Sequence, residues 1–182
     1  MSIKYFPIKD VDKGINTQLP GSMVTWATGR NVRFTPGYVA KTLGKTLLAT
    51  VAGSFPVRAT FTFVGTDGAV RTIVCCDSAV YAYNASMASP STITPTPAPT
   101  GGATDIWQFA LVAGLPILSN GKDAIWKWPV YGSALTALSG APTWAKRISS
   151  CMHRLVVSNI LEGGYTYPGR VRWTEPGNPE NW

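Results

Sequence analysis

The sequence predicts a mostly β chain made of antiparallel meander units, and three observations support this fold class. An apolar run, a tight turn and a second run with alternating aromatics occur together at 72–83 and 116–128, and a third copy begins at 155–159. The period, roughly 40 residues, is typical of stacked β blades. The chain contains 18 Gly and 14 Pro, and no window keeps a 3.6-residue period, which argues against helices. Asn-Gly at 120–121 is a strong hairpin signal. We therefore predict a propeller-like chain, incomplete or open, with an extended N-terminal arm.

The extended arm covers residues 1–25, which are rich in Gly, Pro, Asn and Asp and show little periodicity. Such an arm either docks on a neighbour in an assembly or frays in solution. From Trp26 the pattern turns to β, and the alternation around Val32 and Phe34 before Pro36-Gly37 predicts a hairpin. The meander or propeller-like region therefore runs over 26–182.

The first meander unit begins near Arg58. Phe61 and Phe63 alternate with threonines, 65–68 forms a turn, and 70–76 and 79–83 supply two further strands. Three consecutive strands with short polar turns are the construction unit of a propeller blade.

A Pro- and Thr-rich loop at 89–102 separates the first two units. Prolines at this density disfavour regular ladders, so we expect an exposed connection. The second unit covers 105–128, with turns at Ala113-Gly114 and Asn120-Gly121, and the third begins near Lys146. The segment from 131 to 140 is expected to link the two.

The net charge is +7, with 16 Lys and Arg against 9 Asp and Glu, which favours a polyanionic neighbour without identifying one. Four cations fall within sixteen residues that contain no acid: Arg30, Arg33, Lys41 and Lys45. They form either a solvated strand face or a face turned toward nucleic-acid phosphate.

The three cysteines do not form an evident framework. Cys75 and Cys76 are adjacent, so strand geometry points them to opposite faces, and Cys151 is distant. We expect reduced, buried thiols made in a cytosol. The N-terminus lacks the apolar core of a signal peptide, and no run is long enough for a membrane span.

Catalytic and metal-binding patterns are absent from the sequence. His153 is the one histidine, the nine acids are dispersed, and the glycine pairs lack the context of a nucleotide-binding loop. We therefore expect no enzyme, no cofactor and no metal site.

Two pairs of aromatics share strand faces. Tyr81 and Tyr83 form one pair, and Trp126 and Trp128 form the other. Packing between blades would repeat them at equivalent positions, whereas an exposed stripe could stack sugars or bases.

Both ends of the chain resemble tail nozzle or tail hub proteins of short-tailed bacteriophages. The motifs at the start are Gly14-Ile15-Asn16-Thr17, Leu19-Pro20-Gly21 and Gly29 to Phe34. Those at the end are Arg147 to Val157 and Arg170 to Trp182, and the Ser-Asn-Gly-x-Asp-x-Ile-x-Lys-Trp phrase at 119–128 also fits.

The resemblance implies a structural virion protein of the tail, made in the host cytoplasm. Its copies would form a ring, with six-fold symmetry favoured, that continues the DNA channel below the portal and adaptor. The ring would contact the head-tail connector, other tail proteins and packaged DNA, and would help to retain and deliver the genome. No catalytic residue is implied.

Three units are fewer than the four that a closed propeller typically needs. The sequence therefore predicts either a piece of a longer product or an open assembly completed by neighbouring subunits. Two other functions remain open. A carbohydrate- or receptor-binding module would use exposed Tyr and Trp stripes, and a hydrolase would need a carboxylate pair or His153 in a deep pocket.

Overall fold

The computed structural model describes residues 32–35, 38–41, 51, 55–87 and 90–182. The chain divides into two compact units, Met1–Leu47 and Leu48–Trp182. The described residues of the first unit form an antiparallel hairpin of β1 (Val32–Thr35) and β2 (Tyr38–Lys41), in which Val32 pairs with Lys41 and Thr35 with Tyr38. This hairpin confirms the one predicted around Pro36-Gly37, and the predicted arm at 1–25 lies outside the described residues.

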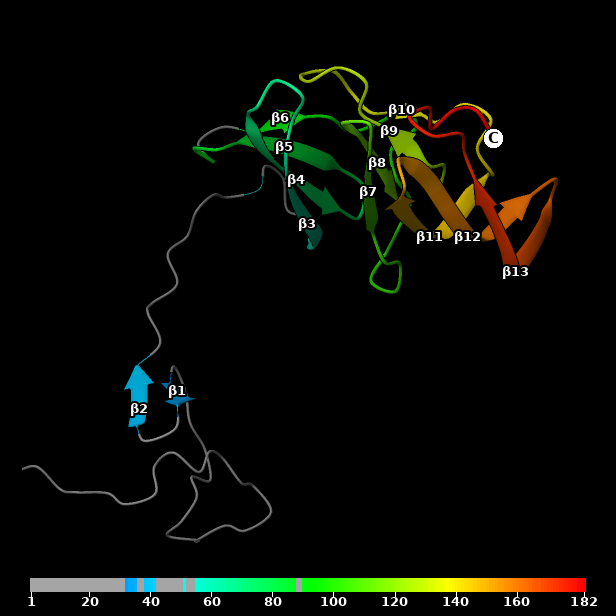
Figure 1. Cartoon of the computed structure of the whole chain (residues 1–182). Helices are drawn as coiled ribbons and strands as arrows, with labels where there is room; N and C mark the ends of the chain where they lie inside the picture. Colours follow the sequence, from blue (N-terminus) through cyan, green and yellow to red (C-terminus); the bar gives the residue numbers. More distant parts are fainter. Residues whose placement is uncertain (1–31, 36–37, 42–50, 52–54, 88–89) are drawn as a thin grey trace, which may run out of the picture. The chain divides into compact units, whose positions relative to one another are not determined.

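The described part of the second unit contains no helix and folds into three antiparallel sheets that follow one another along the chain (Figure 1). The first sheet consists of β3 (Val57–Val64), β4 (Val70–Cys76), β5 (Val80–Asn84) and β6 (Ser91–Thr92). The second consists of β7 (Gln108–Val112), β8 (Leu115–Ser119), β9 (Trp126–Lys127) and β10 (Thr136–Ala137). The third consists of β11 (Trp144–Cys151), β12 (Arg154–Glu162) and β13 (Tyr165–Trp173). The predicted mostly β class and the meander units are confirmed.

The second sheet buries apolar side chains on both faces. Neighbouring residues of a strand point to opposite faces, and accordingly Leu118 packs with the first sheet while Ile117 packs with the third. Likewise, Trp126 packs with the first sheet and Ile125 packs with the third. One core therefore lies between the first and second sheets, and another between the second and third.

The core between the first two sheets is rich in aromatic rings. Phe61 stacks on Phe109 with ring centroids 5.2 Å apart, and Trp107 stacks on Trp126 at 5.7 Å. Rings at these separations gain stabilisation beyond the burial of their area. The alternating aromatics of the sequence therefore hold one sheet on the next.

A fourth strand completes both of the first two sheets, and the sequence pattern did not predict it. Residues 91–92 pair with Ala82 and Tyr81, and Ile93 after them is fully buried. The expectation that the whole loop at 89–102 is exposed was therefore wrong at this end. Residues 136–137 likewise pair with Lys127 and Trp126 inside the segment expected to link two units.

Two of the three cysteine thiols are buried, as the sequence predicts. Cys75 and Cys76 are buried on opposite faces of the first sheet, and burial raises the pKa of the Cys75 thiol. Cys151 is exposed, so the expectation of a buried thiol was wrong there, because this residue ends β11 at a turn.

Candidate functional site

The Ser-Asn-Gly turn after β8 joins the second sheet to the third. The buried Ser119 hydroxyl donates to the Ala145 carbonyl oxygen at 2.6 Å and accepts from the Gly121 amide at 3.2 Å. Gly121 has a φ of 74°, and a Cβ at this position would lie 3.3 Å from Lys146 Cα. Only glycine satisfies both demands without strain, so this turn sets how closely the second sheet approaches β11.

Asn120 and Asp123 organise the loop behind this turn. The Asn120 amide nitrogen donates to an Asp123 carboxylate oxygen at 2.7 Å, and Asn120 Oδ1 accepts from the Asp123 amide at 2.8 Å. The backbone amide and the hydroxyl of Thr100 also donate to Asp123, each at 2.7 Å. Burial alone would raise the pKa of Asp123, but these hydrogen bonds and the Lys122 charge lower it. The loop is therefore ordered by its own polar groups.

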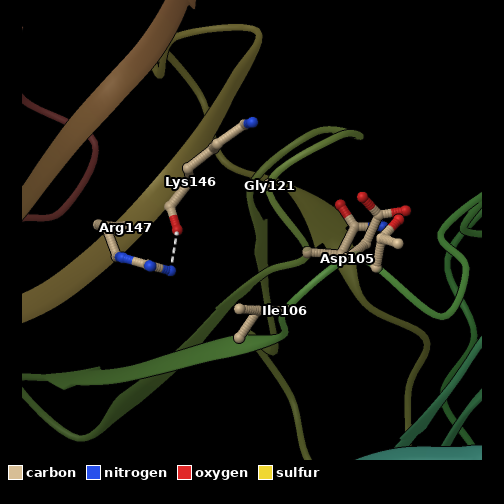
Figure 2. Close-up of a pocket in the computed structure, with 7 residues that line it drawn as sticks. Asp105, Ile106, Gly121, Lys146 and Arg147 are labelled. Carbon is tan, nitrogen blue, oxygen red and sulfur yellow. Dashed lines mark hydrogen bonds between the residues drawn. The ribbon is translucent and has the colours of Figure 1, made fainter. Parts of the chain in front are cut away.

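A cavity of about 210 Å³ opens beside the turn, where the second and third sheets meet. Figure 2 shows Lys146 and Arg147 of β11 on one side of this cavity and Asp105 on the other. Its lining is formed by Thr104, Asp105, Ile106, Asn120, Gly121, Lys146 and Arg147. Two cationic residues, an acidic residue and neutral groups thus line one small space.

The two walls of this cavity differ in their hydrogen bonding. Arg147 Nη1 donates to the Lys146 carbonyl oxygen at 3.3 Å, so the guanidinium lies along its own strand (Figure 2). Across the cavity, Asp105 Oδ2 accepts from the Gly102 amide at 2.9 Å. Neither cation forms an ion pair with any residue that the structure describes.

Ion pairing elsewhere in the second unit distinguishes these cations from most others. Within the described ranges, five cations are paired with carboxylates: Arg58 with Asp77, Arg71 with Asp67, Lys127 with Glu180, and Arg170 and Arg172 both with Glu162. Arg71, Arg170 and Arg172 also lie over the rings of Tyr131, Tyr167 and Trp182. Lys146 and Arg147 are exposed and have no carboxylate partner among the described residues.

The cations singled out in the sequence lie in the first unit. Arg30 and Lys45 fall outside the described residues. Arg33 pairs with Ala40, and Lys41 pairs with Val32, in the β1–β2 ladder. The structure describes only the backbone at these two positions, so their predicted role as DNA-channel cations stays a prediction.

The four candidate aromatics are buried. Tyr81 and Tyr83 lie in a cluster on the face of the first sheet that is turned away from the second, and Trp126 and Trp128 lie in the core between these sheets. Trp128 Nε1 donates to the Ser133 carbonyl oxygen at 2.9 Å. A sugar or base cannot stack on these rings unless the core opens, so they act in packing.

Catalytic groups do not gather in the part of the chain that the structure describes. His153 is exposed in the turn between β11 and β12, with a φ of 60°, and so lies outside the strands of the third repeat unit. No group of His, Cys, Asp and Glu residues suited to a metal ion occurs among the residues described. Within the same ranges, no helix has the length and apolar character to cross a membrane.

Sequence reasoning missed Lys146 and Arg147 as site residues. The sequence does show two neighbouring cations in the strand that begins the third repeat unit. This pattern alone also fits an ordinary solvated strand. No protein-family model matches the chain, and no curated protein matches it either. The function proposed below therefore rests on the geometry of the fold and on the resemblance of the two chain ends.

Proposed function

We propose that the chain is a structural protein of a phage tail, which forms an oligomeric ring, a nozzle or hub, around the DNA channel. The ring continues this channel below the portal and adaptor, contacts other tail proteins, and helps to retain and deliver the packaged genome. Six-fold symmetry is the favoured form. The resemblance of both chain ends to such proteins motivates the proposal, and features of the fold support it.

The distribution of exposed apolar side chains is the observation that carries this proposal. Ten large apolar side chains are exposed among the described residues, and only Ile106 and Val130 of these belong to the second sheet region. The others lie on or beside the first and third sheets: Phe55, Val57, Val64, Val70, Met152, Tyr165, Val171 and Trp173. Val64 and Val70 pair across β3 and β4, and Val171 and Trp173 lie two residues apart on β13, so both sheets carry neighbouring exposed apolar side chains, which are typical of sites of association. The second sheet is covered on both faces by the first and third sheets. The first and third sheets, which we call the end sheets, are therefore suited to contacts with other subunits.

A propeller-like architecture would explain why the same strand phrase recurs. In stacked repeats each unit buries its apolar faces against its neighbours, so equivalent positions carry similar residues. Leu118 and Val74 occupy equivalent places in the phrase; Leu118 lies in the core between the first two sheets, and Val74 lies in the cluster on the face of the first sheet that is turned away from the second. We propose that each of the three sheets corresponds to one blade.

The charge distribution also favours a role beside DNA. Residues 1–47 carry seven Lys and Arg against two Asp, whereas the remaining residues carry nine against seven acids. A basic surface attracts the phosphate backbone without reading its sequence. A channel protein needs this property, because genomes of any sequence must pass.

Electron microscopy of the purified protein tests the proposal. We expect rings in negative stain and a mass of several subunits by light scattering. A protein that stays monomeric at high concentration would contradict it. Under the alternative of a carbohydrate- or receptor-binding module, a glycan would bind instead, but the burial of Tyr81, Tyr83, Trp126 and Trp128 leaves that alternative without its proposed surface.

A further inference from the structure

We propose that the cavity lined by Lys146 and Arg147 binds a phosphate group of the nucleic-acid backbone. This inference rests on the proposed function and names the residues of the second unit that meet DNA. The cavity lies where the second sheet meets β11, and the basic residues singled out in the sequence are not among those that line it. Lys146 and Arg147 supply the charge, and the Asn120-Gly121 turn forms the adjoining wall.

The donors on the cationic wall suit a phosphate. Arg147 commits Nη1 to the Lys146 carbonyl oxygen, which leaves the other N–H groups of its guanidinium for a ligand. A guanidinium presents five N–H donors in a fixed fork that matches two phosphate oxygens, and an ammonium adds a compact charge. Both side chains are exposed, so a polymer backbone can reach them.

The charges around the cavity determine where the phosphate lies. Asp105 on the opposite wall repels an anion, so the phosphate must lie against Lys146 and Arg147 (Figure 2). Asp123 nearby is held by Thr100 and Asn120. The Lys122 ammonium donates to the Thr100 carbonyl oxygen at 2.9 Å, which places a positive charge in the loop that holds Asp123.

The site is fixed in place before a ligand arrives. The Ser119–Ala145 hydrogen bond and the close approach of Gly121 to Lys146 hold β11 against the second sheet. A rigid backbone fixes the positions from which the two cationic side chains extend, without the entropic cost of ordering a loop. The volume of about 210 Å³ admits several waters, each of about 30 Å³, or one phosphate with part of its hydration shell.

Such a site recognises the backbone and does not read bases. Phosphate contacts position a nucleic acid, whereas sequence is read at base edges. The cavity of about 210 Å³ is too small for a base pair. We therefore expect equal affinity for duplexes of different sequence.

Fluorescence anisotropy with a labelled 30-base-pair duplex tests the site in the full chain. The double variant Lys146→Ala, Arg147→Ala is compared with Arg58→Ala, Arg170→Ala, which loses the same charge from two residues that are already ion-paired. We expect at least a tenfold loss of affinity at low salt in the first variant and less than threefold in the second. Removing two phosphate contacts should make the slope of log K against log salt less negative by about 1.8. Thermal melting checks that both variants are folded.

Three results would overturn this inference. They are a wild-type chain that binds no duplex at low salt, an equal loss in both variants, and tighter Lys146- and Arg147-dependent binding of heparin than of DNA. Light scattering on the same samples separates the inference from the proposed function. Wild-type rings without a specific loss in the first variant reject the phosphate site alone. A monomer that shows the specific loss rejects the tail ring and leaves the phosphate site.

Discussion

Gly121 has both a left-handed backbone and a close neighbour in β11, and substitutions can separate the energetic costs of these two features. Its φ of 74° disfavours any side chain, and a Cβ would also lie 3.3 Å from the Lys146 backbone. Gly68 has nearly the same φ, 77°, but a Cβ added there would meet nothing within 4 Å. Comparing alanine at the two positions therefore isolates the contact between the second and third sheets.

We expect Gly121→Ala to destabilise the protein more than Gly68→Ala. The left-handed backbone costs about 1–2 kcal/mol in both variants, and crowding against β11 adds about 1–3 kcal/mol at Gly121 only. Urea unfolding followed by tryptophan fluorescence measures the difference. Equal losses at the two sites would mean that the close approach of the sheets contributes nothing.

The Asn of the repeated phrase shows how a residue choice follows from backbone geometry. Asn159, in the third copy, has a φ of 52°, and the pairing of β12 with β13 shifts register between Ser158 and Ile160. Asn tolerates this region of φ better than most residues do. In the second copy, Asn120 instead uses its side chain to hold the loop to Asp123. One phrase thus serves two local structures.

At the scale of elements, the stacking of sheets depends on large rings in the first core. Trp128 is 2% exposed, and its ring lies 5.1 Å from the Tyr131 ring and 6.3 Å from the Phe63 ring. Truncating a buried Trp removes its transfer free energy and leaves a cavity. The stability of the first two sheets should therefore be sensitive to this position.

We expect Trp128→Ala to lower the free energy of unfolding by about 3–5 kcal/mol. Val130→Ala is the control, because Val130 is 64% exposed and lies outside the surfaces proposed for association, and a surface change of this kind is usually within about 0.5 kcal/mol. Chemical denaturation gives both values. Similar small losses in the two variants would show that the core between the first two sheets tolerates a void.

The longer strands could be predicted from the sequence because two signals coincide in them. β4 and β8 are apolar runs that end in turn residues, and both are buried centrally in their sheets. β6 and β10 have only two residues each, too few to show a period, and their pairing depends on the neighbouring strands. Ile93 is buried although prolines surround it, because Leu135 of the second sheet region donates its amide to the Ile93 carbonyl.

The candidate site could be predicted only in part. The Asn120-Gly121 turn was evident from its dipeptide, and the structure makes it a wall of the cavity. Lys146 and Arg147 stand out because no described carboxylate pairs with them. Ion-pair partners can lie far apart in the sequence, as Lys127 and Glu180 do at a separation of 53 residues. A linear pattern carries no information on such partners, so the free cations become visible only in the fold.

At the scale of the whole molecule, the surfaces of the end sheets decide how the protein associates. Val171 is 48% exposed on β13 of the third sheet, and Trp173, two residues further along the same strand, is 59% exposed. Val130 is 64% exposed in the segment that joins β9 to β10. The two valines are alike in chemistry and differ in location, which makes them a matched pair.

We expect Val171→Asp to dissociate the proposed ring and Val130→Asp to leave it assembled. A carboxylate within an apolar contact loses its hydration without gaining a partner, which disfavours association, whereas the same group on an open surface stays in water. Sedimentation velocity over a range of concentrations should show at least a tenfold weaker association for Val171→Asp, with the melting temperature of both variants close to that of the wild type. If both variants assemble as the wild type does, the β13 face does not take part in the ring. If Val130→Asp alone dissociates it, subunit contacts lie on the second sheet region, contrary to the proposal.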